Sequence, residues 1–256
     1  MHREAFFIGQ LDLIPGCFRA LAYIAALIVA SSASAQSIYQ PLGLQPGDEY
    51  RLLFVTDGKR NALSAEIADY NAFVASEANQ PNSLVGGLAT DWFAIASTND
   101  VDAIGNTGTD PSPPGDTGVP IYLVDGASRI ANHYDHLWAG AQVLLLSAPN
   151  LTQYGVAPSS PQNNVWTGTD YNGVAGGIGG AIGADNTPTL GSSVSPVGRW
   201  INNNFTSVAS EAKSFYAISS ILVAVPEPSA VTLLALAAAA LLTRRPAILA
   251  IQRSRL

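Results

Sequence analysis

The chain has 256 residues, of which 48% are hydrophobic and only 12% charged, so it is not a solvated disordered chain. Its 23 glycines and 16 prolines exclude a coiled coil, because these residues interrupt long helices. The net charge of −7 argues against a nucleic-acid partner, since basic side chains hold such a partner through its phosphates.

Residues 1–35 have the pattern of a secretory signal peptide. An apolar run at residues 20–30 is followed by small residues at Ala33 and Ala35, the A-x-A arrangement that signal peptidase cleaves. The run is too short to span a membrane, although a buried N-terminal helix is an alternative interpretation. Removal of this segment leaves no cysteine, because Cys17 is the only one.

Residues 36–225 are expected to form one exported domain. This segment carries six basic and sixteen acidic side chains, which gives it a net charge of −10. Such an acidic surface suits solubility outside the cell and disfavours binding to anionic membranes or DNA.

The first half of this domain predicts two strands and one helix. A β-rich run predicts a strand over residues 50–56, and apolar residues at helical spacing predict a helix over residues 64–78. Another strand is expected over residues 92–97. The segment 99–118 is dense in Asp, Asn, Gly and Pro and is expected to be a loop.

The second half predicts three more strands separated by loops. Strands over residues 119–124 and 128–131 flank the turn pair Asp125-Gly126. The longest strand pattern covers residues 215–225. Four residues of that pattern are expected on one face: Phe215, Ala217, Ile221 and Val223. The polar and glycine-rich stretches are expected to be loops, over residues 158–164 and 173–195. The pattern as a whole indicates a loop-rich α+β domain.

Residues 226–256 form a three-part tail. The tripeptide Pro226-Glu227-Pro228 precedes an apolar helix at residues 230–242, and the basic segment 244–256 begins with Arg244 and Arg245. Thirteen residues at ~1.5 Å each reach ~20 Å, against a hydrocarbon core of ~30 Å, so this helix is a marginal membrane anchor. The positive-inside rule places the C-terminus in the cytoplasm and the domain outside.

Candidate metal ligands occur in two places. His133 and His136 could share one helical face near Asp135, but a short polar turn is the favoured interpretation. The other set could bind a structural calcium ion through hard oxygen ligands, yet its members also favour turns for local reasons: Asp100, Asp102, Asp170 and Asn172. We therefore expect no cofactor, with structural calcium as the alternative.

The sequence contains no recognisable catalytic motif. It lacks a Gly-x-Ser-x-Gly nucleophile elbow, a phosphate-binding loop with lysine and a His-Glu-x-x-His pair. The four tryptophans are expected in the core, although an exposed one could stack on a sugar: Trp92, Trp138, Trp166 and Trp200. We expect a protein that is not an enzyme.

The tail resembles the PEP-CTERM sorting signal of bacterial exported proteins. The resemblance rests on the order of the tripeptide 226–228, the helix 230–242 and the Arg244-Arg245 pair. In that family an exosortase, a membrane cysteine transpeptidase, recognises the tripeptide and processes the tail. The resemblance implies transient anchoring in the inner membrane, then release or attachment at the cell envelope, cell surface or extracellular polymer.

The exported segment resembles a group of bacterial extracellular domains with a C-type-lectin-like fold. Six pieces occur in the same order over residues 50–223: Phe54–Thr56, Ala68–Asn71, Trp92–Ser97, Ile121–Gly126, Leu137-Trp138 and Val165–Thr169. The resemblance implies paired N- and C-terminal strands, an early helix and a long irregular loop region. The Glu-Pro-Asn and Gln-Pro-Asp tripeptides of calcium-dependent sugar sites are absent.

These patterns together predict an exported bacterial surface or matrix protein. Its domain is expected to bind polysaccharide or protein outside the cell, and its processing partners are expected to be signal peptidase and an exosortase. The alternatives are a passive structural component of the matrix and a hydrolase with an unrecognised site.

Overall fold

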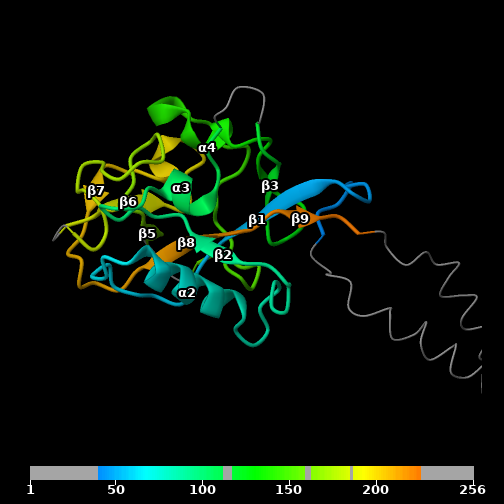
Figure 1. The fold of residues 1–256 in the computed structure, drawn as a ribbon, viewed down its shortest axis with the longest axis horizontal. Helices are drawn as coiled ribbons and strands as arrows, with labels where there is room; N and C mark the ends of the chain where they lie inside the picture. The colour runs from blue at the N-terminus through cyan, green and yellow to red at the C-terminus, as the bar shows by residue number, and fades with distance from the viewer. Residues whose placement is uncertain (1–39, 112–116, 159–162, 185–186, 226–256) are drawn as a thin grey trace, which may run out of the picture. The chain divides into compact units, whose positions relative to one another are not determined.

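Two strands from opposite ends of the domain lie next to each other at the centre of a mixed sheet (Figure 1). The computed structural model describes residues 40–111, 117–158, 163–184 and 187–225, all within one compact unit, Ser37–Val225. In these ranges nine strands form the sheet along the path β4-β3-β1-β8-β5-β6-β7, with β2 paired to β8 and β9 paired to β1. The strands are β1 (Glu49–Val55), β2 (Trp92–Ala94), β3 (Ile121–Leu123), β4 (Arg129–Ala131), β5 (Asn164–Trp166), β6 (Thr189–Ser192), β7 (Phe205–Thr206), β8 (Ser214–Ser219) and β9 (Leu222–Val223).

The helical elements are few and short. They are α2 (Ile67–Ala78), α3 (Ala103–Thr107), α4 (Asp135–Trp138) and the 3₁₀ turns η1 (Gly140–Gln142) and η2 (Gly198–Trp200). The described residues therefore form a mixed α/β architecture that is rich in sheet and poor in helix. None of their helices is long and apolar enough to cross a membrane.

Pairing of the terminal strands confirms one expectation from the sequence. β1 and β8 are antiparallel, with Leu53 opposite Ile218 and Phe54 opposite Ala217. β1 also pairs with β3 in parallel, and β3 forms an antiparallel pair with β4 around the predicted turn. The strands predicted over residues 50–56 and 128–131 are present, and the strand predicted over 119–124 is shorter.

Strands β1 and β8 are buried on both faces, which explains why their sequences are almost continuously apolar. Leu52 and Phe54 contribute to one hydrophobic cluster, whereas Leu53 and Val55 contribute to a second cluster. Successive side chains of a strand point to opposite faces, so the sheet separates the two clusters.

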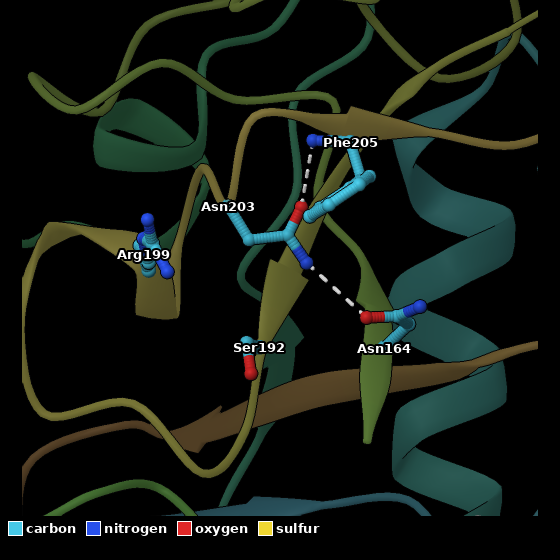
Figure 2. Close-up of a pocket in the computed structure, with 5 residues that line it drawn as sticks. All are labelled: Asn164, Ser192, Arg199, Asn203 and Phe205. Carbon is cyan, nitrogen blue, oxygen red and sulfur yellow. Dashed lines mark hydrogen bonds between the residues drawn. The ribbon is translucent and has the colours of Figure 1, made fainter. Parts of the chain in front are cut away.

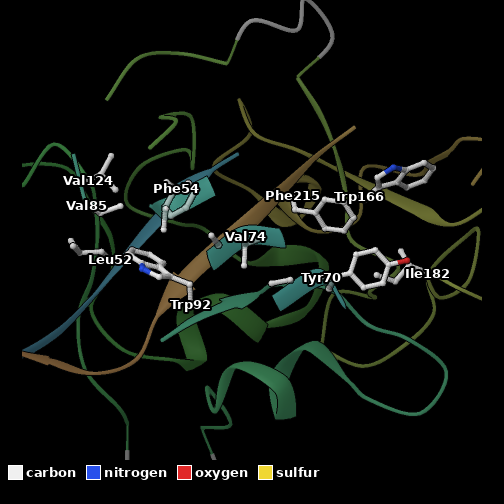
Figure 3. Packing of buried hydrophobic residues seen from close by; sticks show 14 of the residues in the cluster. Leu52, Phe54, Tyr70, Val74, Val85, Trp92, Val124, Trp166, Ile182 and Phe215 are labelled. Atoms are coloured by element: carbon white, nitrogen blue, oxygen red, sulfur yellow. The ribbon is translucent and has the colours of Figure 1, made fainter. Parts of the chain in front are cut away.

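Helix α2 covers the first cluster. Its inward residues Tyr70 and Val74 are fully buried and lie close to Phe215 of β8 (Figure 3). The ring centroids of Tyr70 and Phe215 are 5.1 Å apart. The helix begins at Ile67 rather than at the predicted residue 64.

The second cluster includes residues of α3, α4 and η2, and α4 lies on the other side of the sheet from α2 (Figure 1). Trp200 of η2 lies between two aromatic rings, 5.7 Å from Trp138 and 5.5 Å from Tyr216 between ring centroids. All four tryptophans are buried, as the sequence predicted.

Two segments predicted to be loops contain regular structure. Helix α3 lies inside residues 99–118 and ends at Thr107. It is followed by Gly108, whose φ of +59° is the left-handed conformation typical of the residue after a helix. Strand β6 lies inside residues 173–195. In both segments contacts with distant residues select a structure that the turn-rich composition does not favour. The strand predicted over residues 92–97 ends earlier, at Ala94.

The strand predicted over residues 215–225 is interrupted by a bulge. Tyr50 and Leu53 are three positions apart in β1, whereas their partners Leu222 and Ile218 are four positions apart. One extra residue reverses the alternation of side chains. Ile221 and Val223 therefore do not share a face with Phe215 and Ala217. Phe215 and Ala217 are buried, whereas Ile221 is 45% exposed and Val223 is 54% exposed.

Two asparagine amides close the open edge of β2. Asn71 Oδ1 accepts a hydrogen bond from Ala94 N at 2.8 Å, and Asn106 Nδ2 donates to Ala94 O at 2.7 Å. The two amides also bond to each other, with Asn71 Nδ2 donating to Asn106 Oδ1 at 2.8 Å. They thus satisfy the backbone groups of Ala94 on this side of the strand.

Substitution Asn71→Ala is expected to lower the free energy of unfolding by about 1–3 kcal/mol, because it leaves the Ala94 amide without its acceptor. Urea denaturation measures this change. The control Asn172→Ala removes an exposed amide and is expected to change stability by less than about 0.5 kcal/mol. Equal effects of the two substitutions would contradict the closing role of Asn71.

Candidate functional site

A pocket of about 380 Å³ with a mixed polar and apolar lining opens where β5, β6 and β7 meet η2. Figure 2 shows its lining side chains, which come from all four elements and their junctions: Asn164, Ser192, Arg199, Asn203 and Phe205. Its volume is within the usual range for sites that hold small ligands, roughly 300–1,000 Å³.

Strand register places the lining residues side by side. Asn164 of β5 is opposite Ser192 of β6, and Phe205 of β7 is opposite Leu190 of β6. Turn η2 packs directly on β6, because a Cβ at Gly191 would lie 2.1 Å from the carbonyl oxygen of Trp200. Glycine at this position therefore brings Arg199 close to the strands.

Asn203 is the organising side chain of the pocket. Its Nδ2 donates to Asn164 Oδ1 at 3.2 Å and to Gly191 O at 3.1 Å, while its Oδ1 accepts from Phe205 N at 2.9 Å (Figure 2). Asn203 is only 5% exposed, and these three bonds occupy both amide hydrogens and the carbonyl oxygen. Asn203 therefore holds Asn164 and Phe205 in position and has little capacity left to bind a ligand itself.

The segment Val165–Thr169 forms the support beneath the pocket. Trp166 is fully buried, and Thr167 Oγ1 donates to Ile201 O at 2.7 Å, which ties β5 to the turn after η2. Thr169 Oγ1 lies 2.9 Å from Ser97 Oγ and also bonds to Thr167 O. These buried hydroxyl contacts connect Ser97, the segment 167–169 and Ile201, which are distant in sequence. They hold in place the chain segment that continues from β5.

The remaining polar capacity of the lining consists mainly of hydrogen-bond donors. Across the described parts of the chain, the Arg199 guanidinium, the Ser192 hydroxyl and Asn164 Nδ2 have no protein partner. Phe205 adds an apolar ring that is 67% exposed. The pocket can therefore receive oxygen atoms on one side and an apolar face on another.

The two aspartates Asp102 and Asp170 of the calcium candidates already accept hydrogen bonds within the protein. Asp102 Oδ1 accepts from Ala175 N at 2.6 Å, and Asp170 Oδ1 accepts from Tyr171 N at 2.8 Å. Asp100 and Asn172 are exposed. The Asp102 and Asp170 loops do meet, because Ile104 N donates to Gly173 O. In the described ranges no three acidic, histidine or cysteine side chains converge in a way that could hold a metal ion.

The histidine pair lies on the short helix α4 and the turn before it. The rings of His133 and His136 are 4.0 Å apart between centroids, and His133 also contacts Asp135. Burial and the neighbouring His136 lower the pKa of His133. The described residues around this pair supply no further group that would complete a metal site.

Arg51 is a buried cation, only 6% exposed, and its contacts are with other parts of the protein. Its Nη1 donates to Thr107 O at 2.5 Å, and its guanidinium lies 5.2 Å from the centre of the Tyr134 ring. Burial lowers its pKa. Arg51 thus binds the C-terminal end of α3, where carbonyl groups carry partial negative charge.

The predicted targeting residues lie outside the described residues. They are the signal-cleavage pair Ala33 and Ala35, the tripeptide Pro226, Glu227 and Pro228, and the basic pair Arg244 and Arg245. The predicted membrane helix at residues 230–242 also lies outside them.

The sequence patterns did not predict the pocket. Among the described residues, the aromatic residue that is exposed is Phe205 rather than one of the tryptophans, all of which are buried. A signal was present in the segment 199–205, which places a cation, three consecutive asparagines and an aromatic residue in seven positions. Its partners Asn164 and Ser192 are distant in sequence, so only the fold assembles the site.

Comparisons of the chain with protein-family models and with curated proteins found no match.

Proposed function

We propose that this chain is an exported, non-enzymatic protein of the bacterial surface or extracellular matrix whose domain binds polysaccharide. The observation that carries the binding role is the pocket between β5, β6, β7 and η2, which combines unpaired hydrogen-bond donors with the exposed ring of Phe205. Sugar-binding sites need hydrogen bonds to hydroxyl groups and an apolar surface for the ring. Both are present in one place.

Export and sorting are supported by the sequence at the two ends. The signal-peptide pattern and the PEP-CTERM-like tail each predict that residues 36–225 lie outside the cytoplasmic membrane. The net charge of −10 on this segment is in keeping with that location. The tail is proposed to anchor the protein transiently before exosortase processing.

The arrangement of elements supports a C-type-lectin-like fold for the domain. Its terminal strands pair, helix α2 follows the first strand, and irregular connections occupy much of the described parts of residues 132–213. The distinctive segment Val165–Thr169 forms a central strand and the turn after it. A fold alone does not define a ligand, so the binding role rests on the pocket.

Binding rather than hydrolysis is supported by the chemistry of the lining. Among the described residues, those that line the pocket include no carboxylate and no imidazole, the groups that usually supply acid–base catalysis. A saturable signal on a panel of immobilised polysaccharides, with the sugars recovered intact, is the expected result. Absence of any saturable ligand favours the passive matrix role, and release of shorter sugars favours a hydrolase.

Replacement of Pro226, Glu227 and Pro228 by alanine is expected to leave full-length protein in the membrane of the native host. The physical reason is that the transpeptidase loses its recognition sequence while the apolar helix remains. Membrane fractionation and the intact mass of the recovered protein measure the outcome. A matched control replaces Ser229 and Val231, which flank Ala230, with alanine, and it is expected to be processed normally. Unchanged processing of the tripeptide variant would refute the sorting role.

A further inference from the structure

We infer that the pocket lined by Arg199 and Phe205 selects an acidic sugar, a pyranose ring that bears a carboxylate. This inference rests on the proposed polysaccharide-binding function and adds the class of sugar. Three observations on the described residues carry it: the donor-rich lining, the guanidinium without a carboxylate partner and the exposed aromatic ring.

The hydrogen-bonding balance of the pocket favours a ligand that is rich in acceptors. The carbonyl oxygens of Asn164 and Asn203 already accept bonds from within the protein. Within the described residues, Asn164 Nδ2 and the five N–H groups of Arg199 have no acceptor. A carboxylate supplies acceptors only, so it matches this lining better than a neutral hydroxyl group, which must also donate.

The pocket carries the positive charge of Arg199, whereas the domain as a whole is negatively charged. Three other basic side chains have partners, since Arg60 contacts Asp69, Lys213 contacts Glu211 and Arg129 bonds to Asn132. Among the described residues, exposed Lys59 resembles Arg199 in having none, but it lies outside the pocket. Arg199 has no carboxylate within the described ranges, although its segment carries a net charge of −10. A guanidinium in this state can bind a carboxylate through two parallel hydrogen bonds.

Phe205 supplies the contact to the sugar ring, in addition to the contact of Arg199 to the carboxylate. Its backbone is held on both sides, by the pairing with Leu190 and by the bond from its amide to Asn203 Oδ1. Its side chain nevertheless remains 67% exposed at the pocket. An aromatic ring fixed in this way can pack against the C–H face of a pyranose while Arg199 binds the carboxylate.

The test uses isothermal titration calorimetry of the mature protein with uronate trimers of three configurations: galacturonate, glucuronate and mannuronate. Each acid is paired with its methyl ester, which keeps the ring and removes the charge. At least one acid is expected to bind about tenfold or more tightly than its ester, which is the usual size of a charge-assisted hydrogen bond. Binding is expected to persist in EDTA, because the pocket supplies the contacts without a metal ion.

Variants assign the selectivity to residues. Arg199→Gln is expected to weaken acid binding about tenfold or more and to abolish the difference between acid and ester. Phe205→Ala is expected to weaken both ligands. The control Lys59→Gln removes an exposed positive charge outside the pocket and is expected to leave both affinities unchanged. Arg199 and Phe205 are exposed, so thermal unfolding is expected to be the same for all variants.

The outcomes separate this inference from the proposed function. Equal binding of acid and ester, lost in Phe205→Ala, overturns the acidic selectivity and leaves polysaccharide binding intact. Acid binding that survives Arg199→Gln, or that disappears in EDTA, overturns the assignment to this pocket. No binding of any trimer, together with no saturable signal on the polysaccharide panel, overturns both.

Discussion

Substitution Gly168→Ala is expected to destabilise the domain by about 3 kcal/mol or more, because left-handed strain and steric overlap each cost about 1–3 kcal/mol. Gly168 has a φ of +57°, and a Cβ at this position would lie 2.4 Å from Ile182 N and 2.7 Å from Ser97 O. Both neighbours are backbone atoms, which cannot rotate away as a side-chain tip can.

The position of Gly168 explains why the effect is large. Three chain segments converge there, since Ser97 N donates to Thr167 O and Ile182 N donates to Ser97 O. Gly168 N itself donates to Thr189 O at 3.0 Å. An added methyl group therefore displaces the connections that support β5 and β6, on which the pocket is built.

Chemical denaturation measures this prediction, with Gly105→Ala as its control. Gly105 lies in α3 and has ordinary backbone geometry, and a methyl group added there would meet open space beyond its own helix and chain neighbours. Alanine is a better helix former, so the control is expected to gain up to about 1 kcal/mol. If the Gly168→Ala protein is as stable as the control, the close approach of Gly168 to Ile182 N and Ser97 O is disproved.

Substitution Trp200→Ala is expected to lower the free energy of unfolding by about 3–5 kcal/mol. The indole is fully buried between Trp138 and Tyr216, and its removal leaves a cavity that these large rings cannot fill. Tyr216 Oη also donates to the Trp200 carbonyl at 2.8 Å, which couples η2 to β8. The same substitution is expected to weaken ligand binding, because Arg199 is the preceding residue.

Phe205→Ala is the matched control for this experiment. It also removes an aromatic side chain, but one that is 67% exposed, so stability is expected to change by less than about 1 kcal/mol. Urea denaturation followed by far-ultraviolet circular dichroism compares the two. A similar loss in both variants would contradict the burial of Trp200 as the source of stability.

Hydrophobic patterning was sufficient to predict the parts of the fold that depend on it. The central strand β1, helix α2 and the burial of all four tryptophans follow from apolar content and spacing. Elements β6 and α3 have only four and five residues, and their sequences resemble loops. Their structure depends on contacts with distant residues, which local pattern does not contain.

The bulge after Ile218 and the pocket are two further features that local sequence pattern could not predict. One extra residue between Ile218 and Leu222 moves Ile221 and Val223 off the face of Phe215 and Ala217, and no local pattern in this mostly apolar segment marks the shift. The pocket joins Asn164 to Asn203 across 39 positions, through a bond between two amides that carry no local hydrophobic signal. Composition alone therefore could not locate the site.

The pairing of β1 with β8 has a consequence for how the protein acquires its structure. Leu53 must find Ile218, so the middle of the sheet joins residues separated by almost the entire length of the domain. Proteins dominated by such distant contacts fold slowly, because closing a long loop costs entropy before any contact compensates for it. A chain still emerging residue by residue cannot complete its core until β8 has appeared. Folding is accordingly expected to finish only after nearly the whole domain has been synthesised.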